Sequence, residues 1–71
     1  MDKLFYRRLL IMVNDKSHMD LLHEYVGNRI DILRGQLETA KDMDRVRQIQ
    51  GSIQELKRFK TLREEVIKEA E

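Results

Sequence analysis

Two histidines, His18 and His23, are the residues of this sequence best suited to metal or acid–base chemistry. They lie five positions apart, which on a helix turns one away from the other by about 140°. A zinc pair on one helix face needs a spacing close to four, and His23-Glu24 is not followed by a second histidine at that position. We therefore predict no metal and no cofactor, with His18 in the first turn of a helix and His23 partly buried.

The sequence also lacks a combination of nucleophile and base. It contains no Cys, and its serines are Ser17 and Ser52, of which Ser52 has no histidine within one helical turn. The three glycines are isolated, so they form no loop that could hold a phosphate. We predict a protein that is not an enzyme.

Basic residues are frequent in the second half of the chain and could contact nucleic-acid phosphates. Acidic residues flank them, and Lys60 and Glu64 have the spacing of an ion pair on a helix surface. The net charge is only +1, from 14 basic and 13 acidic residues, so no overall field attracts nucleic acid or membrane. We favour a solvated face of mixed charge, and nucleic-acid binding is the alternative. The residues that would carry that alternative are Arg45, Arg47, Lys57, Arg58 and Lys60.

The composition predicts the elements that position these side chains. The 71 residues are 38% charged and 41% hydrophobic, without Pro, and they are rich in the residues of long helices. The length allows one domain, whose core alone would supply only about 3–5 kcal/mol. Because no Cys is available for disulfides, we expect self-association to supplement this core.

No apolar run is long enough to span a membrane or to act as a signal peptide, so we expect a cytoplasmic protein.

Hydrophobic periodicity predicts an all-α fold with three helices, over residues 2–13, 17–41 and 44–69. The run from Leu9 to Val13 also fits a strand, which periodicity cannot separate from a helix in so short a segment. Ser17 is the expected N-cap of the second helix, and Asp42 or Asp44 that of the third. The short connection favours an antiparallel helical hairpin, and we expect two copies to form a bundle. Apolar residues spaced three and four apart form the two facing seams of this coiled-coil pattern: Val26, Ile30, Leu33 and Leu37, and then Val46, Ile49, Ile53 and Leu56.

Apolar residues remain beyond these seams. Leu21, Tyr25 and Ile32 lie about 120° from the seam of their helix. They must be covered by the N-terminal segment, through Leu4, Phe5 and Leu9, by a second copy of the chain, or by both together.

Two glycines are candidates for the same interface. Gly35 and Gly51 fall opposite their own seams and at one level of the hairpin. They mark either the close approach of another chain or two glycines tolerated on exposed faces.

The C-terminal end is acidic, with Glu64, Glu65, Glu69 and Glu71. Acidic residues at a helix C-terminus oppose the helix dipole, so we expect this end to fray unless a partner holds it. Val66 and Ile67 would then be exposed, in a docking tail or a frayed helix end.

The segment Arg29-Ile-Asp-Ile-Leu-Arg-Gly-Gln-Leu-Glu-Thr-Ala40, with the later Gln50-Gly-Ser-Ile-Gln-Glu-Leu-Lys57, resembles small helical proteins of tailed bacteriophages encoded near head and packaging genes. The similarity extends over about residues 29–62. It implies a phage accessory or structural protein without catalytic activity, in the host cytoplasm or the virion, and it assigns no residue a role. We accordingly predict an assembly module that self-associates and docks on a larger protein. An inhibitor of a host enzyme, acting through the acidic end, is a further alternative.

Overall fold

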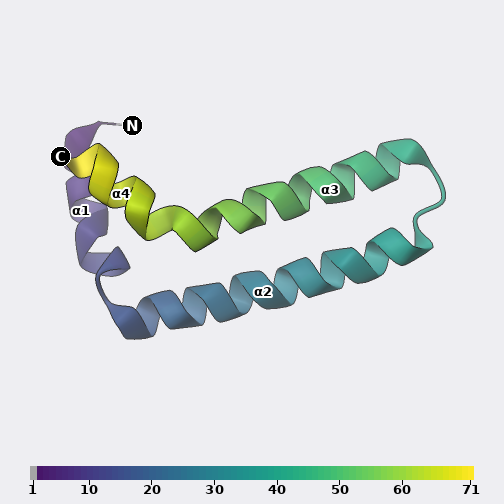
Figure 1. Ribbon diagram of the computed structural model, residues 1–71, viewed down its shortest axis with the longest axis horizontal. Helices are drawn as coiled ribbons and strands as arrows, with labels where there is room; N and C mark the ends of the chain where they lie inside the picture. The colour runs from purple at the N-terminus through teal and green to yellow at the C-terminus, as the bar shows by residue number, and fades with distance from the viewer. Residues whose placement is uncertain (1) are drawn as a thin grey trace.

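The computed structural model in Figure 1 describes residues 2–71, and this part of the chain is helical and contains no strand. The helices are α1 (Lys3–Val13), α2 (Lys16–Thr39), α3 (Met43–Arg58) and α4 (Leu62–Ala70), with a 3₁₀ helix η1 (Phe59–Thr61) between the last two. The predicted all-α class is confirmed. The N-terminal segment, for which a strand was an alternative, forms α1.

Aspartate side chains start the three longer helices. The carboxylates of Asp2, Asp15 and Asp42 each accept a hydrogen bond from the backbone N–H three residues later, at 2.9, 3.0 and 2.8 Å. Each bond satisfies a backbone donor that has no partner inside its helix. Asp15, and not the expected Ser17, therefore caps α2, which begins at Lys16.

The helices α2 and α3 lie side by side and run in opposite directions, joined by a short loop (Figure 1). The buried side chains between them belong to the two seams predicted from the spacing of apolar residues. Each fully buried aliphatic side chain stabilises the fold by about 1.5–3 kcal/mol. We call this group the central cluster: Val26, Ile30, Leu33, Ile49 and Ile53, with Leu22, Leu37, Ala40 and Leu56 packed against it.

The helix expected over residues 44–69 is divided in the structure. It changes to a 3₁₀ helix at Phe59, and α4 leaves in a different direction from α3 (Figure 1). The Thr61 hydroxyl donates a hydrogen bond of 3.2 Å to the Arg58 carbonyl, which offers the backbone an alternative to a continuous helix. The apolar stripe of the sequence drifts at the same place, after Leu56, because the later apolar residues pack against another element.

That element is α1, which packs against α4 at the end where the two termini meet (Figure 1). Val13, Met19 and Val66 form the core of this terminal cluster. The expectation that Val66 is exposed is wrong: its side chain is 0% exposed. The flanking side chains are Tyr6, Leu9, Leu10, Leu22 and Leu62.

Polar contacts also connect α1 to the acidic end of the chain. The Arg7 guanidinium donates to the Ala70 carbonyl at 3.4 Å, and the Arg63 guanidinium donates to the Asn14 side chain at 3.1 Å. A cation at a helix C-terminus interacts favourably with the helix dipole, so Arg7 offsets the acidic residues of α4. In the structure the last helix thus packs against α1 of its own chain and remains helical to Ala70, whereas the sequence predicted a frayed end.

Candidate interaction surface

The side of α2 that points away from the central cluster is an exposed helix face with large apolar side chains. Leu21, Tyr25 and Ile32 are 64%, 62% and 50% exposed there. Their positions continue through Asn28 and Gly35 with alternating spacings of four and three, and both of these residues are exposed. We call these five residues the α2 stripe. Their spacing is that of a coiled-coil seam.

The N-terminal segment does not cover this stripe. Leu9, expected at the interface, is half-buried in the terminal cluster. Phe5 is 40% exposed, and its ring meets the ring of Tyr6 edge-on with 6.1 Å between centroids. Because α1 packs its apolar face against α4, it leaves the α2 stripe exposed.

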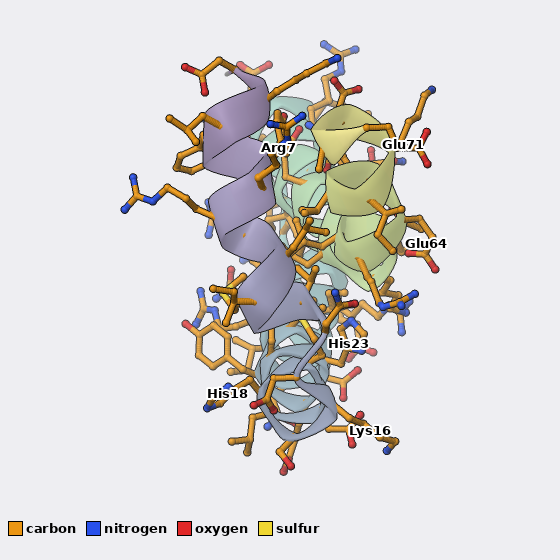
Figure 2. All side chains as sticks on the ribbon, turned by 90° about the vertical axis from the view of Figure 1, so that its left-hand side faces the viewer. Arg7, Lys16, His18, His23, Glu64 and Glu71 are labelled. Atoms are coloured by element: carbon orange, nitrogen blue, oxygen red, sulfur yellow. The ribbon has the colours of Figure 1, made fainter. Side chains whose placement is uncertain are left out.

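Figure 2 indicates which side of the molecule the α2 stripe faces. His18 points to the side of α2 on which α1 lies, whereas Lys16 points the other way. His18 precedes Tyr25 by seven residues, so both lie on one face of the helix. The α2 stripe therefore faces the same side as α1, which has exposed apolar residues of its own, Leu4 and Ile11 among them.

The two glycines of the expected interface are open to solvent. A Cβ atom added to Gly35 or Gly51 would meet no atom within 4 Å. Nothing inside the chain requires glycine at either position. Gly35 belongs to the α2 stripe, whereas Gly51 lies in a shallow groove between α2 and α3 that Arg29, Gln48 and Ser52 also line.

The basic residues expected to contact nucleic acid do not form one surface. Arg45 donates a hydrogen bond of 3.0 Å to the Gln36 side chain, and Arg47, two positions later on α3, points about 160° away from it. Arg58 lies 3.4 Å from the Glu55 carboxylate and 3.7 Å from that of Glu65. The acidic neighbours thus neutralise only Arg58, whereas Arg47, Lys57 and Lys60 are exposed and take part in none of the ion pairs recorded among residues 2–71.

The histidines and the charged groups near them are on the surface. His23 is exposed, so the expectation of partial burial is wrong; its position lies just outside the face that packs on α3. The Nδ1 atom of His18 is 3.2 Å from an Asp15 carboxylate oxygen.

The side-chain nitrogen of Lys16 lies 2.9 Å from the Asp20 carboxylate, and the hydrogen bond and charge of that carboxylate raise the pKa of Lys16. Within residues 2–71, His, Asp and Glu side chains form no group of three that could hold a metal ion.

Comparisons with protein-family models, with curated proteins and with solved structures find no match to this chain. Among the described residues, no helix combines the length and the apolar character needed to cross a bilayer.

Apolar spacing within single helices does not predict the packing of α1 on α4. Two signals for it were present. The apolar stripe drifts after Leu56 toward Leu62, Val66 and Ala70, and α1 carries its own stripe of Tyr6, Leu9 or Leu10, and Val13.

Proposed function

We propose that this protein is a non-enzymatic assembly module that pairs with a second copy of itself through the α2 stripe and docks on a larger protein. The observation that carries the proposal is the exposure of Leu21, Tyr25 and Ile32 on one helix face with coiled-coil spacing. In the proposed assembly the antiparallel hairpins of α2 and α3 from two chains form a helical bundle.

The small size of the chain favours a second copy of itself as the partner that covers the α2 stripe. A domain of this size buries only about 60% of the surface that its unfolded chain exposes, so self-association adds core that one chain lacks. In a two-fold symmetric pair each residue of the stripe is used twice. Gly35 allows the backbones to approach closely, because no atom of its own chain occupies that space.

The larger partner would use a different surface. Leu4 and Ile11 of α1 are 67% and 83% exposed and lie on a different helix from the α2 stripe, so they are the residues that this partner would contact. The resemblance of residues 29–62 to small helical phage proteins suggests that this partner is a component of a phage particle or its packaging machinery. The expected location is then the host cytoplasm or the virion.

Sedimentation equilibrium of the full chain tests the self-association. We expect a species of twice the 8.6 kDa chain mass, and a monomer for the Ile32→Lys variant, with the helical circular dichroism signal retained. Ile11→Lys is the matched control, because Ile11 is still more exposed and lies outside the stripe; it should remain a dimer. A wild-type chain that stays monomeric at high micromolar concentration would contradict the proposal.

Nucleic-acid binding remains a second candidate because Arg47, Lys57 and Lys60 are exposed and take part in none of the ion pairs recorded among residues 2–71. Titration with RNA and with DNA at low salt distinguishes it from the first. Binding that weakens steeply as salt rises, and that is lost on changing these three residues to Gln, would support it.

A further inference from the structure

Charged residues border the α2 stripe differently on its two sides. Glu24, Asp31 and Glu38 follow one edge at intervals of seven residues. The other edge carries Arg29 and Gln36, also seven apart, and all five residues are exposed. Glu24 and Arg29 take part in none of the ion pairs recorded among residues 2–71, so both charges are available to a partner.

The stripe fits the heptad notation of a coiled coil, in which positions a and d face the partner and positions e and g flank them. Tyr25 and Ile32 then occupy a, and Leu21, Asn28 and Gly35 occupy d. The acidic edge corresponds to position g and the edge with Arg29 to position e.

The orientation of two paired helices decides which edges meet. In a parallel pair, position g of one helix lies beside position e of the next heptad of the other, so Glu24 meets Arg29 of the second copy. In an antiparallel pair, g meets g and e meets e. The acidic edge would then face a second acidic edge, and like charges in contact oppose association.

We infer that two copies of the chain pair through α2 in parallel and in register, with Glu24 of each copy beside Arg29 of the other. The inference rests on the proposed self-association and adds its orientation. The in-register arrangement places Asn28 beside Asn28 of the second copy, where the two side-chain amides can hydrogen-bond to each other. Ile at position a and Leu at position d, as at Ile32 and Leu21, favour two strands over more.

Disulfide cross-linking tests the orientation, because the chain has no Cys of its own. Leu21→Cys and Gly35→Cys are made separately, and their positions are about 21 Å apart along the helix. Two cysteines form a disulfide only if their Cα atoms come within about 7 Å. In the parallel pair each variant therefore cross-links to itself, and a mixture of the two, one of them carrying an affinity tag, gives little mixed product. Arg34→Cys, on the opposite side of α2, is the control that should not cross-link.

Charge reversal gives an independent measurement. Arg29→Glu should weaken the dimer roughly tenfold, because two attractive contacts become repulsive. The double variant Glu24→Arg with Arg29→Glu should restore it. Glu24→Arg alone should weaken a parallel dimer, whereas it would strengthen an antiparallel one by relieving the contact between acidic edges.

The outcomes separate this inference from the proposed function. A wild-type dimer whose two cysteine variants cross-link mainly to each other would overturn the parallel orientation and leave self-association intact. A dimer in which neither variant cross-links would also overturn the inference, because the interface would then lie elsewhere or the two α2 helices would pair antiparallel, with position d facing position a. A monomeric wild type would overturn both.

Discussion

The two hydrophobic clusters of this small protein form in different ways. The central cluster joins two helices that follow each other in the chain and share one pattern of apolar spacing. The terminal cluster joins α1 to α4 through Val13 and Val66, which α2 and α3 separate in the sequence, and it includes Met19 of α2. The first is a consequence of local periodicity, whereas the second depends on η1, which redirects the last helix.

The two clusters cover some apolar helix faces within the chain and leave another exposed to solvent. The face of α2 that packs on α3 is completed inside the chain, and so is the apolar face of α4, which α1 covers. The α2 stripe has the spacing of a seam but no partner within the described residues. A helix can thus carry two seams, of which folding of one chain uses only the first.

The largest expected effect tests whether the two clusters are independent. Val66→Asp places a charge without a partner in the terminal cluster and should destabilise the protein by about 4 kcal/mol. We expect hydrogen exchange to show lost amide protection in α1 and α4, with protection in α2 and α3 retained. The matched variant Ile49→Asp, in the central cluster, should remove protection throughout the chain. Equal loss everywhere in both variants would show that the clusters form one cooperative unit.

A smaller effect concerns the start of α3. Asp42→Ala removes the side chain that caps this helix and should lower the free energy of unfolding by about 1 kcal/mol. Asp44→Ala is the control, since Asp44 lies in the first turn without capping it. Urea unfolding followed by circular dichroism measures both. If the control variant lost as much stability as Asp42→Ala, the cap would not be the source of the effect.

The smallest effect concerns the contact that joins the two ends of the chain. Arg7→Gln removes the guanidinium that donates to the Ala70 carbonyl and should cost about 0.5 kcal/mol, since the contact is only partly buried. For a domain of this size that corresponds to a Tm lower by about 2–4 °C. Arg8→Gln, on the next residue of α1, should leave Tm unchanged. A Tm that falls equally in the two variants would argue against a specific contact between Arg7 and α4.

The apolar faces of α2 could be predicted because they follow from the spacing of apolar residues within one helix. The apolar spacing of Val26, Ile30 and Leu33 identifies the face that is buried, and the same spacing at Leu21, Tyr25 and Ile32 identifies a second face on the same helix. The exposure of that second face could not be predicted. That exposure depended on whether α1 would pack on the second face of α2 or on another helix, and the sequence agreed with either arrangement.

The break at Phe59–Thr61 lay beyond the sequence analysis for a related reason. Residues 44–69 have no Pro, and their only Gly, Gly51, lies inside α3, so local preferences favour one continuous helix. The loss of helical hydrogen bonding at the turn is offset by the burial of Val66 against α1.

The sequence by itself determined that the chain is helical, where its longer helices approximately lie, and which faces of α2 are apolar. These properties follow from residues three and four positions apart, whose interactions are already set within one helix. Only the tertiary structure decided that α1 covers α4 and leaves the α2 stripe open, because that choice depends on contacts between residues distant in the chain. It reflects the packing of Val13 and Met19 around Val66, three side chains that no local pattern connects.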